Sequence, residues 1–352
     1  MKNQAIDLLK QLISIPSISK EEQKTAELIE EFFANQGVEV NRNGNNVWVK
    51  NLHFDNAKPT VLLNSHHDTV KPNAGYSKDP YSPDVVDGKL YGLGSNDAGG
   101  ALVSLMAAFL HFYDQALDFN LILAATAEEE ISGRNGISSI LDELGNIDFA
   151  IVGEPTEMQM AIAEKGLMVL DCLVEGTAGH AAREEGENAI YKALPVVEWF
   201  NNYEFEKVSE TLGPIKMSVT QIAAGSQHNV VPDECSFVVD VRSTNAYQNE
   251  EILAIISQHV DCEVKARSTR LNPSGISIDH PIVQSGLDLG LSTYGSPTLS
   301  DQALLPFPSL KIGPGDSARS HTADEYIYIK EIEEGIDTYI ALLNPILNPS
   351  LK

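Results

Sequence analysis

Short apolar runs alternate with helical segments through the first half of this sequence. The runs TVLLN, LILAAT and FAIVG have the length and composition of buried strands, and ALVSLMAAFLHFY has that of a buried helix. A strand–helix–strand rhythm of this kind predicts an α/β fold, a doubly wound, mostly parallel sheet with helices on both faces. Residues that follow these strands are therefore expected to gather at one edge of the sheet.

Histidines and carboxylates stand at or soon after these runs. His66 and Asp68 lie in SHHDTV, Asp97 in YGLGSND, Glu129 and Glu130 in TAEEE, and Glu154 in VGEPT, and His321 follows much later. These are residue types that bind divalent metal ions. The pattern predicts a site for two metal ions at the sheet edge.

The N-terminal segment predicts two helices. The first spans Asp7 to Ile13 and ends before Pro16, which cannot continue a helix. The second is expected to begin at a capping box over residues 19–22, with Ser19 as its cap, and to end at Gly37. Gly99 and Gly100 are expected to let the helix after Asp97 pack closely on the sheet.

The character of the sequence changes near Lys165. The next hundred or so residues contain two helical segments and strands of alternating apolar and polar residues, as in an antiparallel sheet with one solvated face. This predicts an inserted α+β domain of ferredoxin-like type. We expect a discontinuous catalytic metal-binding domain at residues 1–165 and 273–352, and a lid and dimerisation domain at residues 166–272.

Composition excludes several classes of protein. With 352 residues and 43% hydrophobic content, the chain is long enough for two domains. A formal net charge of −26 argues against nucleic-acid binding, because phosphates are bound by clustered Lys and Arg. Cys172, Cys235 and Cys262 show no disulfide framework, which favours the cytoplasm. Neither a signal peptide nor a membrane-spanning run is apparent, so we expect no membrane partner.

The predicted ligands suit the hydrolysis of an amide. This reaction needs an activated water, a polarised carbonyl and a proton for the leaving amine. Two metal ions roughly 3.5 to 4 Å apart, bridged by a carboxylate, can supply the first two requirements. A nearby carboxylate that binds no metal can carry the proton from the water to nitrogen.

Seven motifs stand in the order in which one known family carries them. They are His66-x-Asp68, Gly94-x-x-Asp97, Glu129-Glu130, Gly153-Glu154-Pro155, Gly179-His180, Asn229-Val230-Val231-Pro232, and His321 followed by Asp324-Glu325. On these residues the sequence resembles the M20 metallopeptidase and deacylase family over nearly its whole length.

The resemblance implies how two divalent metal ions per subunit would be held. His66 and Glu154 would bind one ion, Glu130 and His321 would bind the other, and Asp97 would bridge them. It also implies a cis peptide bond between Asp97 and Ala98. Zinc is the expected metal, and cobalt and manganese remain open because carboxylate and imidazole ligands accept all three.

The resemblance also implies catalytic roles. Asp68 would orient His66, and Glu129 would be the general base and then the general acid. The family usually carries Asp-Glu-Glu, which matches Glu128 to the aspartate and selects Glu129 and Glu130 as the functional pair. Adjacent strand residues point to opposite faces, so the chain must turn at this pair for both to serve one site.

Three residues of the insert are implied to act on the substrate. His180 would reach the active site of the partner subunit of a homodimer and stabilise the tetrahedral oxyanion. Asn229 and Arg242 would contact the substrate, since an arginine can bind a carboxylate with two hydrogen bonds.

The expected activity is removal of an N-acyl group from a small-molecule N-acyl amino acid by a metal-dependent hydrolase of linear amides. The segment KIGPGDSARSHTADEY favours N2-acetyl-L-ornithine, cleaved to L-ornithine in arginine biosynthesis, as by acetylornithine deacetylases. Other interpretations are an N-succinylornithine or succinyl-diaminopimelate desuccinylase, a hydrolase of carrier-protein-linked lysine or ornithine, and a dipeptidase or aminopeptidase of the same family. A non-enzymatic binding protein is disfavoured because all the expected ligands are present.

Overall fold

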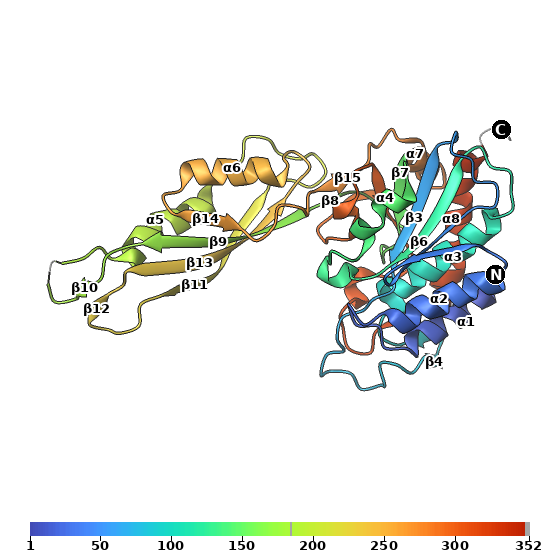
Figure 1. The fold of residues 1–352 in the computed structure, drawn as a ribbon, viewed down its shortest axis with the longest axis horizontal. Helices are drawn as coiled ribbons and strands as arrows, with labels where there is room; N and C mark the ends of the chain where they lie inside the picture. The colour runs from blue at the N-terminus through green and yellow to red at the C-terminus, as the bar shows by residue number, and fades with distance from the viewer. Residues whose placement is uncertain (184, 349–352) are drawn as a thin grey trace. The chain divides into compact units, whose positions relative to one another are not determined.

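The computed structural model describes residues 1–183 and 185–348, which divide into two compact units (Figure 1). The first unit comprises Met1–Ile162, Gly275–Tyr294 and the chain from Ser300 onward. The second comprises Ala163–Ser274 together with Gly295–Leu299. The second unit thus interrupts the sequence of the first in two places, a long segment and a short one.

The first unit is built on a mixed, mostly parallel sheet, and the predicted α/β fold class is confirmed. Within the described residues the strand order is β1-β2-β6-β3-β7-β17-β8-β15, with β16 paired to β8. β6, β3, β7 and β17 are parallel neighbours, and β2 joins β6 antiparallel. The strands are β1 Val40–Asn43, β2 Asn46–Lys50, β3 Thr60–His66, β6 Asn120–Thr126, β7 Phe149–Val152, β8 Met160–Glu164, β15 Ser274–Gly275, β16 Thr293–Ser296 and β17 Ser309–Lys311.

The central strands are buried on both faces. Every residue of β3, β6 and β7 is buried, as expected for parallel strands that are covered on both sides. One face packs against a large cluster that includes residues of α1, α2, α3, α7 and α8, and the other against a smaller cluster that includes Trp48, Ile137 and Leu144. The helices of this unit are α1 Lys2–Ile13, α2 Gln23–Asn35, α3 Gly100–Phe112, α4 Leu141–Leu144, α7 Pro281–Asp288 and α8 Ile329–Leu347.

The capping box predicted at Ser19 is wrong. α2 begins at Gln23 with Glu22 at its N-cap, and the hydroxyl of Ser19 donates instead to Asp68, at 2.7 Å. The capping box does not form because the N–H of Ser19 donates to the carbonyl of Thr69 at 3.3 Å, while Glu22 accepts the N–H of Lys20. Gly37 adopts a left-handed φ of 75° two residues after α2 ends, as its predicted role requires.

Short elements shape the loops around the carboxyl edge of the large sheet. β18 Tyr326–Tyr328, β5 Lys89–Tyr91 and β4 Val85–Val86 form a small sheet in that order. The short helical turns are η1 Ser95–Gly99, η2 Glu129–Ile131, η3 Ile137–Ser139, η4 Asp301–Leu304 and η5 Ser317–Arg319. A Cβ at Gly99 would collide with the carbonyl oxygen of Gly94, so the glycine is required for the tight start of α3.

The second unit has the predicted ferredoxin-like arrangement of strands and helices. Its antiparallel sheet has the order β11-β13-β9-β14, and α5 and α6 pack on one face around Phe237 and Ile256. A separate pair, β10 and β12, forms a short antiparallel ladder. The elements are β9 Gly166–Glu175, β10 Gly179–His180, α5 Ala189–Asn202, β11 Lys216–Ala224, β12 Val230–Val231, β13 Glu234–Ser243, α6 Asn249–His259 and β14 Glu263–Ala266.

The cysteines are free thiols, but two of them are not isolated. Cys172 and Cys262, 90 positions apart by number, share a hydrogen bond between their thiols in the second unit, on β9 and just before β14. Within the described residues, no helix is both long and apolar enough to span a bilayer.

Candidate metal centre

The carboxyl ends of three neighbouring parallel strands bring the predicted ligands together. His66 is the last residue of β3 and pairs with Thr126, the last residue of β6. Glu129 follows β6 by three residues and Glu154 follows β7 by two. Gly153 donates to the carbonyl of Asn64 at 2.7 Å, and this bond fixes the segment that carries Glu154 against β3. The gathering at the sheet edge follows from strand order.

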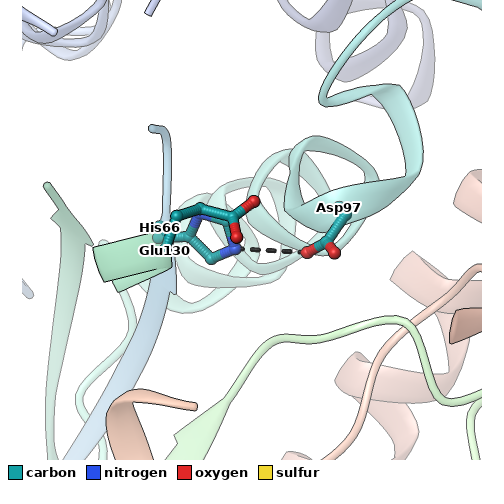
Figure 2. A group of neighbouring side chains, drawn as sticks. All are labelled: His66, Asp97 and Glu130. Atoms are coloured by element: carbon teal, nitrogen blue, oxygen red, sulfur yellow. Dashed lines mark hydrogen bonds and ion pairs between the residues drawn. The ribbon is translucent and has the colours of Figure 1, made fainter. Parts of the chain in front are cut away.

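His66 lies at the centre of this group with its two ring nitrogens in different surroundings. Its Nδ1 lies 2.9 Å from the carbonyl oxygen of Asp68 and 3.4 Å from the Asp68 carboxylate. Its Nε2 lies 3.3 Å from Asp97, and Figure 2 shows this contact. The same nitrogen lies 3.8 Å from both Glu129 and Glu154. Hydrogen bonding at Nδ1 places the proton there, which leaves Nε2 free to bind a metal among the carboxylates.

Asp97 lies between the two histidines. One oxygen is 3.3 Å from Nε2 of His66, and the other is 3.6 Å from Nε2 of His321. The peptide bond between Asp97 and Ala98 is cis, as the sequence resemblance implied. A carboxylate with one oxygen toward each histidine has the geometry needed to bridge two ions.

The chain turns at Glu129 and Glu130, which allows both side chains to face one site. Glu128 and Ser132 have left-handed backbones, with φ of 55° and 46°, on either side of the turn η2. The carboxylate of Asp68 accepts the amide N–H groups of Glu129 at 3.0 Å and Glu130 at 3.2 Å. Asp68 therefore holds this turn as well as lying beside His66.

The side chain of Glu128 points elsewhere. Its carboxylate accepts hydrogen bonds from the backbone and the side chain of Asn135, at 3.3 and 2.8 Å. Glu129, in contrast, forms one potential ligand group with His66 and Glu154, and Glu130 forms another with His66 and Asp97. The geometry favours the last two glutamates of TAEEE as the functional pair.

His67 is directed away from the site. Its Nδ1 lies 2.9 Å from the hydroxyl of Thr25 and its Nε2 lies 2.9 Å from the carbonyl of Asn45. Burial lowers the pKa of His67. Strand alternation explains why the two adjacent histidines have opposite surroundings.

His321 approaches from the loop before β18, with a left-handed φ of 59°. Its Nε2 lies 3.0 Å from Glu130, and its side chain is 56% exposed, in contrast to the buried His66. The hydrogen bond to Glu130 raises the pKa of His321 to about 9. His321 thus lies on the open side of the centre, while the side chain of Glu130 beside it is only 7% exposed.

Burial raises the pKa values of two carboxyl groups of the cluster, Glu129 and Glu154. At Asp97, in contrast, burial is outweighed by the hydrogen bond to His66 and by the charge of that histidine, which lower the pKa. Burial raises the pKa of Glu154 to about 8, and the Asp97 carboxylate adds to this effect. Burial also raises the pKa of Glu129 well above its ordinary value. Burial disfavours the imidazolium of His66, but Glu129 and the other neighbouring carboxylates outweigh this and raise its pKa. Imidazole nitrogens and carboxylate oxygens packed this closely fit two divalent cations, which would neutralise the cluster.

Several supporting residues were not predicted. Glu22 is fully buried and lies near the backbone N–H of Glu128, at 3.3 Å, while Ser19 donates to Asp68. Asp301 is buried and accepts hydrogen bonds from Asn64, two residues before the end of β3, and from Thr126, the last residue of β6. Glu325 also supports the site, because it accepts the N–H groups of Asn96 and Asp97. The sequence indicated this residue as part of the Asp324-Glu325 pair in the motif that begins at His321.

The residues predicted to act on the substrate lie in the second unit. His180 is exposed on β10 opposite Val230, and its Nδ1 accepts the N–H of Ala182 at 3.1 Å. Asn229 lies nearby, since its carbonyl accepts the N–H of Ala181 at 3.0 Å. The guanidinium of Arg242 instead binds Asp240, on its own strand, at 2.8 and 3.1 Å. These two bonds use its Nε and one N–H of Nη2, so the guanidinium keeps further N–H donors.

Comparison with known sequences identifies the relatives of this chain. A family model described as peptidase family M20/M25/M40 matches residues 62–344. A succinyl-diaminopimelate desuccinylase of Wolbachia pipientis wMel is 26% identical over 386 residues, covering 100% of this chain and 96% of the relative. A protein of the same name from Rickettsia bellii (strain OSU 85-389) is 27% identical over 377 residues, covering 97% and 96%.

Solved structures share the fold. The aminopeptidase PepT from Bacillus cereus ATCC 10987 superposes with a TM-score of 0.79 and 16% identity, over 98% of this chain and 99% of that one. A dinuclear metal-binding peptidase from Bacillus subtilis gives a TM-score of 0.74 and 15% identity, over 98% of both chains. At these identities the likeness establishes the architecture of the two units.

Metal binding is expected to release protons and to tighten as pH rises. At neutral pH the metal-free protein retains protons on Glu154 and His321, whose pKa values are raised to about 8 and about 9. A cation must displace these protons, so its affinity increases as pH rises through this range and decreases below it. Calorimetric titration of the metal-free protein with Co²⁺, in buffers of different ionisation enthalpy, measures the release. Heats that do not depend on the buffer would contradict this expectation.

Proposed function

This chain belongs to peptidase family M20/M25/M40, and from that premise we propose that it is a dinuclear metal-dependent amidohydrolase that removes an N-acyl group from an amino acid. The observation that carries the proposal is the convergence of His66, Asp97 and Glu130, and of His66, Glu129 and Glu154, within ligand distance of one another. Zinc is the first candidate metal for this mixed set of nitrogen and oxygen ligands, followed by cobalt and manganese.

We place N-succinyl amino acids first among the substrates. The full-length relatives described above are named succinyl-diaminopimelate desuccinylases, which supports a succinyl group over an acetyl group. N2-acetyl-L-ornithine is the second candidate, on the segment KIGPGDSARSHTADEY that contains His321. Both substrates would present a linear amide to the same centre.

Each ligand has a role in the proposed chemistry. His66 and Glu154 would hold one ion, Glu130 and His321 the other, and Asp97 would bridge them. The ions would polarise the scissile carbonyl and lower the pKa of the attacking water. Asp68 keeps Nε2 of His66 directed at the cluster and holds the turn that carries the glutamate pair.

Glu129 is the proposed proton carrier. It would accept a proton from the attacking water and pass it to the nitrogen of the leaving amine. Burial makes its carboxylate more basic than a solvated glutamate, which suits a group that must both take and return a proton. The hydrogen bonds from Asn135 to both oxygens of Glu128 support Glu129 over Glu128 for this role.

His180 is the proposed donor to the tetrahedral oxyanion. Because its Nδ1 accepts the amide N–H of Ala182, the proton of the neutral ring lies on Nε2. An exposed Nε2–H is a suitable donor to a developing negative charge. Asn229, on the neighbouring segment, and Arg242 are proposed to contact the substrate.

A homodimer through the second unit is part of the proposal. β11 lies at an edge of its sheet, where unpaired backbone groups can pair with a second strand. The adjacent helix α5 exposes Tyr191 (72%) and Leu194 (57%), and β11 exposes Ile222 (58%). A groove of about 970 Å³ that includes Leu194, Ile215 and Met217 runs along the same elements. These apolar side chains support an interface between subunits.

Glu129→Gln is expected to lower kcat by at least about 100-fold, because glutamine cannot accept the proton. Metal content should stay at two ions per subunit, measured by inductively coupled plasma mass spectrometry. Glu128→Gln is the matched control and should retain most of the activity, since its side chain contacts Asn135. Loss of turnover in Glu128→Gln but not in Glu129→Gln would mean that the glutamate pair is assigned in the wrong register.

A substrate panel tests the proposed activity. Succinyl-diaminopimelate and N-succinylornithine should be hydrolysed with a higher kcat/KM than N-acetylornithine, carrier-linked ornithine or lysine, and simple dipeptides. Release of the free amine is measured with the metal-loaded protein. Preference for N-acetylornithine would reverse the order of the two acyl groups. Preference for dipeptides would overturn the deacylase assignment in favour of a peptidase.

Mixing two inactive variants tests whether His180 acts across the dimer. Subunits with His180→Ala retain Glu129, and subunits with Glu129→Gln retain His180. If His180 enters the partner's site, a mixed dimer has one complete site, so equal mixing should restore up to about a quarter of the wild-type activity. Each variant alone is the control. No recovery in a mixture shown to contain mixed dimers would place His180 outside the partner's site.

A further inference from the structure

Glu325 is a buried carboxylate whose role the chemistry above does not explain. Glu325 is only 1% exposed and directly precedes β18. Its Oε1 accepts the backbone N–H groups of Asn96 at 2.9 Å and Asp97 at 3.0 Å. The N–H of Gly94 is directed at the same carboxylate. Backbone N–H groups that converge in this way form a concave site for a hydrogen-bond acceptor, here filled by a side chain of the same chain.

The backbone of Glu325 is held firmly enough to act as an anchor. Its carbonyl accepts the N–H of Gly92 at 3.0 Å, and the next residue, Tyr326, pairs with Tyr91 in the small sheet. The loop that carries Asp97 and the loop that carries His321 are thus joined twice, by the pairing of β5 with β18 and by the carboxyl group of Glu325.

The two loops also meet through Asn96. Its side-chain nitrogen donates to the carbonyl of Asp316 at 3.1 Å, and its side-chain oxygen accepts the N–H of Asp316 at 3.1 Å. Ser320 contributes a hydrogen bond to the Asp97 carboxylate. Glu325 differs from these residues because it binds the backbone of Asp97 itself.

The position of Asp97 matters because each of its oxygens has a separate partner. One lies 3.3 Å from His66 and the other 3.6 Å from His321. His321 stands four residues before Glu325 on the same loop. A shift of the Asp97 backbone would therefore change both distances at once.

We propose that Glu325 is a positioning residue of the metal centre, whose carboxylate fixes the backbone of Asp97 so that the aspartate spans the two metal positions. This inference rests on the proposed dinuclear function, but it concerns metal binding and not the identity of the substrate. Glu325 itself binds no metal and touches no substrate. Its effect on turnover passes through Asp97.

Glu325→Ala, Glu325→Gln and the surface control Glu334→Ala test the proposal. Glu325→Ala leaves the N–H groups of Asn96 and Asp97 without a partner and should weaken binding of one ion by about 10- to 100-fold. Glu325→Gln keeps an oxygen that accepts both N–H groups, so its affinity should stay within a few-fold of wild type. Binding of Zn²⁺ and Co²⁺ is measured by equilibrium dialysis, and the visible spectrum of the Co²⁺ form reports ligand geometry.

The outcomes separate positioning from a general loss of structure. Circular dichroism and thermal unfolding of the metal-free variants show whether each one folds. Two tightly bound ions and an unchanged Co²⁺ spectrum in folded Glu325→Ala would overturn the proposal, and so would a Glu325→Gln defect as large as that of alanine. If Glu325→Ala does not fold, amide hydrogen exchange in the metal-free wild type tests whether Glu325 holds the N–H groups of Asn96 and Asp97. Slow exchange at Asn96 and Asp97 supports the anchor, and fast exchange refutes it. A failed substrate panel would leave these measurements unaffected.

Discussion

The crowding of buried carboxylates at the carboxyl ends of β6, β3 and β7 is the constraint on which the rest of the site depends. Asp97, Glu129 and Glu154 lie around the Nε2 of a single buried histidine, His66, within 3.8 Å of it. Like charges at this range in a buried site repel one another, and only protons or cations relieve the repulsion. The sheet supplies the rigid frame that holds the carboxylates together against this repulsion.

Around this cluster, a layer of hydrogen bonds determines where each carboxylate points. Asp68 holds the amides of Glu129 and Glu130 and is itself bonded by Ser19, while Glu325 holds those of Asn96 and Asp97. In both cases a carboxylate that is not a proposed ligand fixes the backbone of one that is. Hydrogen bonds from backbone N–H groups to a carboxyl oxygen are directional, which suits this task. The metal centre is therefore held through its backbone as well as through its side chains.

The second unit differs from the first in how its sheet is covered. Its sheet has one face covered by α5 and α6, and the exposed apolar side chains on α5 and β11 lie outside that core. The short β10–β12 ladder brings His180 and Asn229 onto adjoining segments, although 49 positions separate them by number. The unit thus carries an exposed imidazole together with exposed apolar side chains on α5 and β11.

The sequence by itself determined the α/β class, the strands that end beside the ligands, and the residue types of the metal centre. Those features follow from local periodicity and from the rule that parallel strands share a carboxyl edge. It also indicated the turn at Glu129, since two adjacent carboxylates cannot serve one site from an extended strand. Only the tertiary structure decided which partner each polar side chain takes. Ser19 bonds Asp68 in place of capping a helix, Glu128 bonds Asn135, and Glu325 bonds Asn96, a residue 229 positions away. These hydrogen-bond partners are distant in the sequence and come together only when the chain folds. Local sequence patterns therefore do not predict them.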